Sequence, residues 1–170
     1  MTRCARMPEQ APVTVTYLAL DDPAEIRPAR PPRLPVEIER VDPPDGDVSR
    51  WFYTAVGGAY AWTDWLDNDE ATWQAHAEQV ETWVATVGGQ RAGYVELLPR
   101  DDEVEIAFFG LLRPYQGQGI GGHLLTFALR RAFELGRRVW LHTCSLDGPH
   151  ALPNYEARGM VPYRVETESR

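Results

Sequence analysis

The chain of 170 residues contains no lysine, only two cysteines and no long hydrophobic run. Without lysine, Schiff-base catalysis and a lysine general base are excluded. Cys4 and Cys144 are too few for a disulfide framework or a cysteine-rich metal site, so we expect no metal and a reducing cytoplasm. The apolar runs are far shorter than the roughly 20 residues of a membrane span. The first ten residues also lack the apolar stretch of a secretory signal.

Positive charge is scarce as well. Seventeen arginines face 25 acidic residues, which gives a net charge of −8. This balance argues against a nucleic acid as the main partner and favours a cationic one. The apolar fraction of 44% and the charged fraction of 25% are ordinary for one globular domain. We predict a flexible N-terminus over residues 1–12 and a single domain over residues 13–170.

Strand and helix patterns succeed each other along the domain. Residues 27–35 contain four prolines and are predicted as a stiff connector. Asp47, and Asp67 with Glu70, are predicted to begin two helices. Three strands joined by short turns must be antiparallel. The predicted elements are strands over 13–20 and 36–41, helices over 47–56 and 67–78, strands over 82–87, 91–98 and 103–109, a helix over 121–135, a strand over 139–144, a helix over 151–158 and a strand over 161–166. This order predicts an α/β fold with a mixed sheet.

The most informative segment is a glycine-rich turn before the long helix. Four of the six residues 117–122 are glycine, and an amphipathic helix follows directly. Such a turn exposes successive backbone N–H groups at a positive helix end, which suits a phosphate or pyrophosphate. The letters also fit the dinucleotide pattern G-x-G-x-x-G. That alternative is disfavoured because antiparallel hairpins precede the turn and only 48 residues follow Gly122.

Two motifs resemble the GNAT N-acetyltransferase superfamily. The pattern Gln116-x-x-Gly119-x-Gly121 matches the [Q/R]-x-x-G-x-[G/A] signature, and residues 151–160 (ALPNYEARGM) are similar to A-x-x-L-Y-E-K-x-G-F. Both motifs have the order and separation found in that family, and the resemblance covers about residues 36–166. It implies a GNAT-like acyl-CoA N-acyltransferase fold, in which helices flank a central mixed sheet.

The resemblance also implies acetyl-CoA as the cosubstrate. The turn would hold the pyrophosphate, and the preceding strand, with a bulge expected at Gly110, would pair with the pantetheine arm. Gly148 stands where the family often has an asparagine that contacts CoA, and Asn154 is the expected substitute. The other expected cofactor-binding residues are Phe109, Gly110, Leu111, Gln116, Gly117, Gln118, Gly119, Ile120, Gly121 and Gly122.

Acetyl transfer to an amine calls for an acid and a base. The resemblance implies that Tyr155 protonates the departing thiolate. Glu105, on the strand that leads into the cofactor site, is the candidate base acting through water. His142 and Asp147 are reserve candidates. Cys144 raises the alternative of a covalent acetyl-enzyme, but direct transfer in a ternary complex is favoured because strand cysteines are usually small buried hydrophobes.

The acceptor is expected to contact an aromatic segment. Six of the eighteen aromatic residues lie within residues 51–65, and their ring faces suit a cation or a flat ring. About half of them are expected to belong to the core instead. The candidates for acceptor binding are Trp51, Tyr53, Tyr60 and Trp62.

These observations together predict an N-acetyltransferase that acts on a small-molecule or peptide amine. The alternative is a catalytically silent acyl-CoA-binding domain with the same fold. Neither a nucleic-acid nor a membrane partner is expected. The sheet edges leave a homodimer possible, and the identity of the acceptor stays open.

Overall fold

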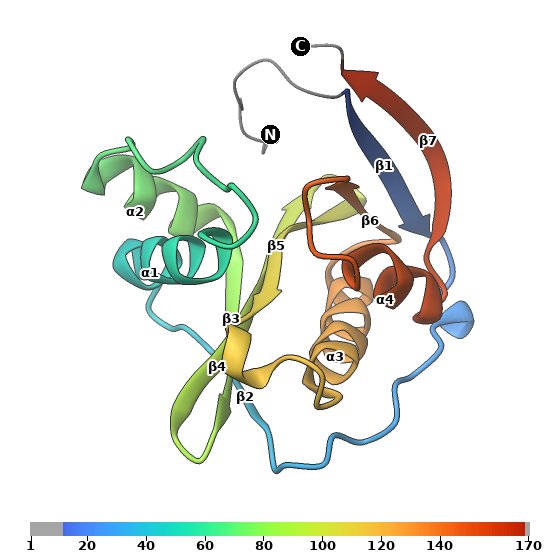
Figure 1. Ribbon diagram of the computed structural model, residues 1–170, viewed down its shortest axis with the longest axis horizontal. Helices are drawn as coiled ribbons and strands as arrows, with labels where there is room; N and C mark the ends of the chain where they lie inside the picture. Colours follow the sequence, from blue (N-terminus) through green and yellow to red (C-terminus); the bar gives the residue numbers. More distant parts are fainter. Residues whose placement is uncertain (1–11, 169–170) are drawn as a thin grey trace.

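The computed structural model describes residues 12–168 (Figure 1). All the predicted strands and helices are present in the predicted order, and two short 3-10 helices, η1 (Pro23–Glu25) and η2 (Arg113–Tyr115), lie in loops. The predicted flexible segment 1–12 lies outside the described residues except for Pro12. The elements are β1 (Val13–Leu20), β2 (Glu37–Arg40), α1 (Gly46–Gly57), α2 (Glu70–Gln79), β3 (Glu81–Val87), β4 (Gln90–Arg100), β5 (Glu103–Leu111), α3 (Ile120–Leu135), β6 (Arg138–Cys144), α4 (Ala151–Ala157) and β7 (Val161–Glu168).

The strands form one mixed sheet in the order β2-β3-β4-β5-β6-β1-β7. β5 and β6 run parallel, and all other neighbours are antiparallel, including the three strands for which short turns required it. β1, the first strand of the chain, lies between β6 and β7. The local sequence of β1 contains no signal for that position, because its partners lie more than 100 residues further along the chain.

Alternation along β4 separates two cores on opposite faces of the sheet. Val95 and Leu97 pack with the buried face of α3 and with Tyr155 of α4. Tyr94 packs with Phe52 of α1 and the other aromatic residues of the α1 and α2 side. In Figure 1, α1 and α2 lie to the left of β5, and α3 and α4 lie to its right. The candidate site is formed where β5 separates these two halves.

The predictions that Asp47 and Asp67 cap the first two helices are wrong. The carboxylate of Asp45 caps α1 by accepting from the N–H of Asp47 at 2.9 Å. Asp69 caps α2 by accepting from the N–H of Thr72 at 2.8 Å. Both segments are rich in aspartate, and the residue that caps is the one whose backbone is extended just before the first turn.

The proline-rich connector runs along the start of α3. The N–H of Ala29 donates to Oγ1 of Thr126 at 3.0 Å, and the N–H of Arg27 donates to the carbonyl of Arg158 at 2.9 Å. Pro32 lies against Gly119, at 3.5 Å from the point where a Cβ would stand. The connector therefore forms one wall beside the glycine-rich turn, as well as joining β1 to β2.

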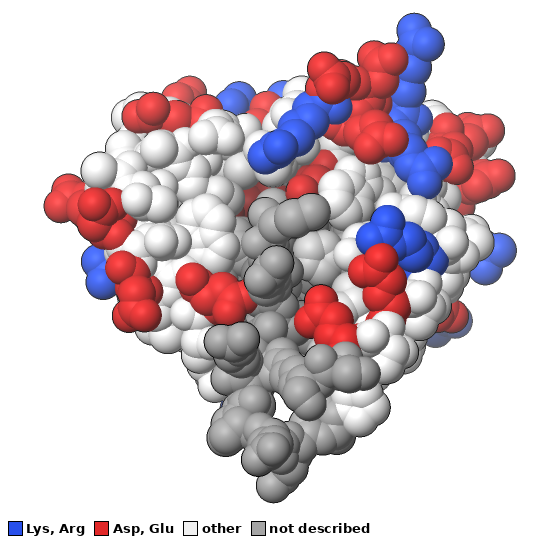
Figure 2. Space-filling view, turned by 90° about the horizontal axis from the view of Figure 1, so that it is seen from above, with Lys and Arg blue, Asp and Glu red and all other residues white. Residues whose placement is uncertain are grey.

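On the face shown in Figure 2, charged side chains of both signs are exposed. Figure 2 shows acidic side chains scattered across the face seen from above, with arginines interspersed among them. No helix among residues 12–168 has the length and apolar character needed to cross a membrane.

Candidate active site

The central feature of the candidate site is a split between two parallel strands. β5 and β6 pair only where Glu103–Glu105 lie opposite Arg138–Trp140. Beyond that point β5 continues to Leu111 paired with β4 alone, and β6 continues to Cys144 paired with β1. Along residues 106–111, the split leaves an open edge formed by the backbone N–H and C=O groups that do not face β4. Such an edge can pair with an extended ligand as a further strand would.

A bulge bends β5 at the split, and it lies at Ala107 rather than at Gly110 as predicted. Adjacent residues of β4 lie opposite Ile106 and Phe108, which leaves Ala107 without a partner. Gly110 is required for a different reason. A Cβ at this position would lie 2.3 Å from Cγ1 of Val56, so only glycine lets α1 pack this closely on β5.

The glycine-rich turn follows β5 and leads into α3. Gly117 and Gly119 have φ values of +74° and +82°, which L side chains rarely adopt. Gly119 is the N-cap of α3, and no side chain caps this helix. The first N–H groups of α3 therefore remain available to an anion, at the positive end of the helix dipole.

Tyr155 lies on α4 directly beside the open part of β5. Its ring packs on Phe109, with 6.0 Å between the ring centroids, and the residue is 7% exposed. Burial raises the pKa of the Tyr155 phenol well above its ordinary value, and the nearby carboxylate of Asp147 raises it further. The side chain therefore stays a protonated hydroxyl at neutral and moderately alkaline pH.

Tyr60 and Trp62 reach the same region from the segment between α1 and α2. The hydroxyl of Tyr60 accepts from Nε2 of Gln116 at 2.9 Å. Nε1 of Trp62 donates to Oδ1 of Asp147 at 3.3 Å. The Tyr60 ring also fills the space beside Gly148, where a Cβ would lie 2.9 Å from its Cε1 atom. This packing explains why a glycine stands where the family often has an asparagine.

Asp147 holds the loop between β6 and α4 in place. Its Oδ2 accepts from Oγ1 of Thr143 at 2.6 Å and from the N–H of Cys144 at 3.0 Å. With Trp62 on its other oxygen, the carboxylate is occupied by three donors. The structure thus gives Asp147, a reserve candidate for the base, a positioning task beside Tyr155.

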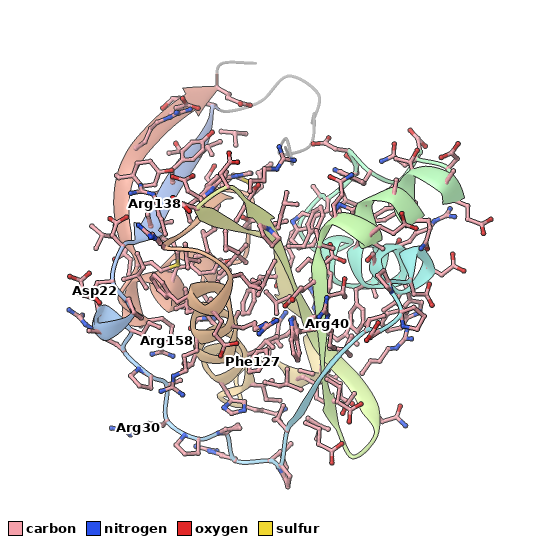
Figure 3. All side chains as sticks on the ribbon, turned by 180° about the vertical axis from the view of Figure 1, so that it is seen from behind. Asp22, Arg30, Arg40, Phe127, Arg138 and Arg158 are labelled. Atoms are coloured by element: carbon pink, nitrogen blue, oxygen red, sulfur yellow. The ribbon has the colours of Figure 1, made fainter. Side chains whose placement is uncertain are left out.

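Arg158 is a candidate binding residue that the sequence analysis missed. Nη1 of Arg158 lies 2.3 Å from the point where a Cβ of Gly122 would stand, and Figure 3 shows the side chain beside α3. Its Nε is buried without a hydrogen-bond partner, and the guanidinium forms no ion pair among residues 12–168. A partly buried cation without a partner is costly, and a phosphate would supply the missing acceptor.

Asn154 lies one helical turn before Arg158, on the same face of α4. Its Nδ2 is 3.7 Å from the Cβ position of Gly121. Two polar side chains of α4 thus face the uncapped first turn of α3. The sequence analysis identified only Asn154. The spacing of four residues, which places Arg158 on the same side of the helix, could have identified Arg158 as well. The available N–H groups and the unpartnered Nε fit a cofactor that carries phosphate groups, as acetyl-CoA does.

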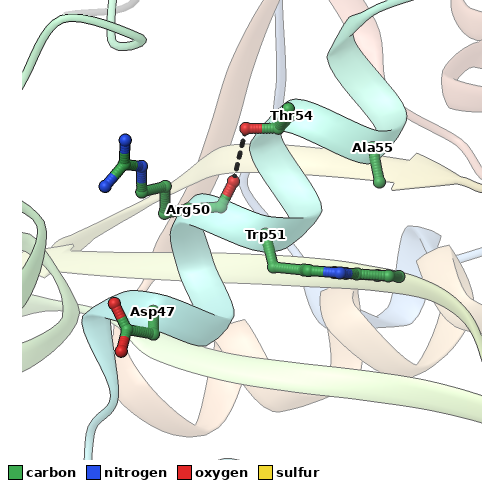
Figure 4. Close-up of a pocket in the computed structure, with 5 residues that line it drawn as sticks. All are labelled: Asp47, Arg50, Trp51, Thr54 and Ala55. Atoms are coloured by element: carbon green, nitrogen blue, oxygen red, sulfur yellow. Dashed lines mark hydrogen bonds between the residues drawn. The ribbon is translucent and has the colours of Figure 1, made fainter.

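The remaining predicted acceptor residues lie on or within α1: Trp51 faces outward, and Tyr53 is buried behind Trp62 and Phe108. Trp51 is 43% exposed on the outer side of α1, with the Arg91 guanidinium 4.7 Å from its ring centroid. It lines a surface pocket with Asp47, Arg50, Thr54 and Ala55 (Figure 4). Tyr53 is 1% exposed in the aromatic core between α1 and α2. Tyr60 and Trp62 are thus the members of this group that border the split.

Glu105 lies at the last paired position before the split, opposite Trp140. Its neighbours Val104 and Ile106 join the core under α3, so its side chain points to the opposite face of the sheet. Among residues 12–168 this half-buried carboxylate forms no hydrogen bond or ion pair. His142 follows on β6, where its ring packs against Tyr17.

Cys144 is 7% exposed, and no cysteine among the described residues is a free thiol. A covalent acetyl-enzyme needs an accessible thiolate, so this position favours direct transfer. Histidine, cysteine and carboxylate side chains among residues 12–168 form no group of three or more that would hold a metal ion.

A second polar cluster, also missed from the sequence, lies under α1 and α2. Glu96 of β4 is fully buried. One carboxylate oxygen accepts from Oγ of Ser49 at 2.5 Å and from Oγ1 of Thr82 at 3.2 Å, and the other lies 2.5 Å from Nε2 of His76. Three partners satisfy this carboxylate inside an aromatic core. Because it has no exposed surface, it ties α1, α2 and the sheet together and does not meet a substrate.

Comparison with known proteins agrees with this geometry. The model of the acetyltransferase (GNAT) family matches residues 45–160. No curated protein matches the chain. Among solved structures, the chain is similar to a GCN5-related N-acetyltransferase from Kribbella flavida, with 19% identity and a TM-score of 0.63, over 91% of this chain and 58% of that one. A GCN5-related N-acetyltransferase from Sphaerobacter thermophilus gives 17% identity and a TM-score of 0.66, over 93% and 51%.

A shorter protein resembles the chain as well. The ribosomal-protein-S18-alanine N-acetyltransferase from Escherichia coli has 20% identity and a TM-score of 0.58, over 74% of this chain and 77% of that one. The chain spans only 58% and 51% of the length of the Kribbella flavida and Sphaerobacter thermophilus proteins. At these identities the similarity shows the fold, and the substrate must be argued from the site.

Proposed function

Because the chain belongs to the GNAT acetyltransferase family, we propose that it transfers an acetyl group from acetyl-CoA to a primary amine of a small molecule or peptide. The split between β5 and β6 carries this proposal. It opens one strand edge between the buried phenol of Tyr155 and the uncapped start of α3. An acyl-CoA molecule requires these three features side by side: a strand edge for its extended arm, a proton donor for its sulfur and free N–H groups for its phosphates.

Each part of the cofactor has matching groups on the protein. The backbone of Phe109–Leu111 pairs with the amides of the arm, and the N–H groups of the turn over residues 116–122 hold the pyrophosphate. Asn154 and Arg158 add polar contacts from α4. When bound, acetyl-CoA supplies an activated acetyl thioester.

The acceptor must lose a proton before it attacks. An alkyl amine with a pKa near 10.4 is neutral in only about one molecule in a few thousand at pH 7. Glu105 draws this proton through a water molecule, so that the free amine attacks the thioester carbonyl in the ternary complex. A backbone N–H of the open part of β5 stabilises the developing oxyanion.

Tyr155 completes the transfer as general acid. Its hydroxyl donates a proton to the departing sulfur as the C–S bond breaks. The attacking nitrogen releases its remaining extra proton, which returns through water to the Tyr155 phenolate, and the products are free CoA and the acetylated amine. The raised pKa of Tyr155 keeps this donor protonated.

Tyr60 and Trp62 border the acceptor side. Their ring faces and the acidic excess of the chain favour a cationic amine. Trp62 is anchored on Asp147 and Tyr60 on Gln116, so both rings are held in place before the acceptor enters.

Two measurements test the proposal. Calorimetric titration should detect binding of acetyl-CoA and no binding of NAD, and release of free thiol should then identify acceptors within a panel of amines. Binding of NAD alone would revive the dinucleotide alternative. Acetyl-CoA binding without turnover on any amine would favour the acyl-CoA-binding domain instead.

A further inference from the structure

β7 forms one edge of the sheet within the described residues, and its side chains are unusually exposed. Val161, Tyr163 and Val165 are 59%, 50% and 61% exposed. They are three of the six large hydrophobic side chains exposed among residues 12–168, and the other three lie on separate parts of the chain. An apolar edge strand with unpaired backbone groups is a ready template for another strand.

The other edge of the sheet lacks these features. β2 has only four residues and directly follows Pro35 and Val36. Its exposed glutamates, Glu37 and Glu39, oppose pairing with a further strand. β7 has eight residues, and its proline, Pro162, stands near its beginning. The two edges therefore differ in whether a further strand can join them.

We propose that β7 pairs antiparallel with β7 of a second copy of this chain, around a two-fold axis at Val165. Tyr163 is left unpaired at a bulge, so the regular part of β7 begins at Arg164. Arg164 and Glu166 are two residues apart on one face and form an ion pair within the chain. In an antiparallel pair centred on Val165, Arg164 of each copy lies opposite Glu166 of the other. The strand is complementary to itself in charge, and two Val165 side chains meet on the axis.

Contacts with Tyr17 of β1 hold both charged side chains on one face of the strand before a second copy binds. Oε2 of Glu166 accepts from the hydroxyl of Tyr17 at 3.3 Å, and the Arg164 guanidinium lies 4.4 Å from the Tyr17 ring centroid. Pairing of two copies therefore orders few additional side chains, which lowers the entropic cost of association.

Analytical ultracentrifugation of the full chain tests the proposal. The wild-type chain should sediment at twice 19.2 kDa. Arg164→Glu places two glutamates opposite each other in both cross-strand pairs, and Glu166→Arg places two arginines there. Each variant alone should raise the dimer dissociation constant at least tenfold. An equimolar mixture of the two should form a mixed dimer, because both pairs then join opposite charges.

Controls separate this interface from others. Arg130→Glu changes an exposed arginine on α3 and should leave the dimer intact. The double variant R164E/E166R should dimerise like the wild type, and it supplies the test if a single variant loses the native circular dichroism spectrum. A monomeric wild type, a dimer that resists both single variants, or a folded but monomeric double variant would each overturn the proposal.

Discussion

The two helix pairs cover opposite faces of one sheet and differ in how they use it. On the side of α3 and α4, β5 and β6 separate, and much of the candidate site is backbone: the open edge of β5 and the N–H groups of the glycine-rich turn. On the side of α1 and α2, aromatic rings close around the carboxylate of Glu96, and little is left open. We therefore expect the first half to bind the cofactor, whereas the core around Glu96 supports the sheet and only the segment with Tyr60 and Trp62 borders the acceptor.

Removal of the phenol tests the reactive half most strongly. Tyr155→Phe keeps the ring on Phe109 but removes the proton donor, so kcat should fall by about 1,000-fold, within the range of general acid catalysis. The affinity for acetyl-CoA, measured by calorimetry, should stay unchanged. Unaltered turnover would remove Tyr155 from the mechanism and leave it a packing residue.

The pH profile of the wild-type enzyme extends this test. As the proposed general acid, Tyr155 acts in its protonated form, and its raised pKa keeps that form populated beyond the ordinary tyrosine range. The rate should therefore show no loss attributable to this residue between pH 7 and about 10, the unperturbed tyrosine value. A fall in kcat near pH 8 that Tyr155→Phe abolishes would contradict the assignment.

Glu96 tests the supporting half. Glu96→Ala leaves Ser49, Thr82 and His76 without their shared acceptor, and the free energy of unfolding should fall by about 3 kcal/mol. Urea denaturation followed by circular dichroism measures this change. The folded fraction should keep its kcat. If kcat falls while stability is retained, the division into a reactive and a supporting half is wrong.

Arg158 tests whether the proposed cofactor site extends beyond the sequence motif. Arg158→Leu should weaken acetyl-CoA binding about tenfold, the size of a charge-assisted hydrogen bond. The free protein should not lose stability, since an unpartnered cation is removed. Calorimetry with acetyl-CoA and with acetyl-pantetheine, which lacks phosphates, distinguishes the contacts. Arg130→Leu on the exposed surface of α3 is the matched control, and an equal loss with acetyl-pantetheine would exclude a phosphate contact.

The same comparison explains how much the sequence could predict. The order of the strands and helices, the antiparallel pairing of β3 to β5 and the glycine-rich turn were predictable, because each depends on a pattern within a few residues. The bulge at Ala107 depends on the register of β4 against β5. The place of β1 between β6 and β7 depends on partners more than 100 residues away. Local patterns contain neither kind of information.

Side chains that act through distant partners were the hardest to predict. In the sequence, Glu96 is a charged residue within an apolar strand. Its partners Ser49 and His76 could not be predicted, because only the fold brings them to it. From the sequence alone, Arg158 is indistinguishable from a surface arginine, and only the fold brings its side chain against Gly122. Trp51 and Tyr53 were grouped with Tyr60 and Trp62 by proximity in sequence. Helix α1 turns Trp51 outward and buries Tyr53 in the core behind Trp62.

Gly122 tests the packing between α3 and α4 with a smaller effect. In Gly122→Ala the new Cβ would meet Nη1 of Arg158 at 2.3 Å and Cβ of Ala29 at 2.9 Å, so the arginine must move. Acetyl-CoA binding should weaken about fivefold, or about 1 kcal/mol. In the double variant with Arg158→Leu, Gly122→Ala should cause little further loss of acetyl-CoA affinity, because both substitutions act on the same contact. Full additivity in calorimetry would show that the two positions act separately.

The smallest effect is expected at Trp51, and it tests the boundary of the acceptor region. The ring lies on the outer side of α1 beside Arg91, away from the split. Trp51→Ala should leave the acceptor KM unchanged and lower the free energy of unfolding by less than about 1 kcal/mol, the value of an exposed cation–π contact. Trp62→Ala is the matched comparison and should raise that KM severalfold, because its ring is fixed on Asp147 beside Tyr155. If both variants raised KM equally, the acceptor region would extend from Trp62 over the outer side of α1 as well.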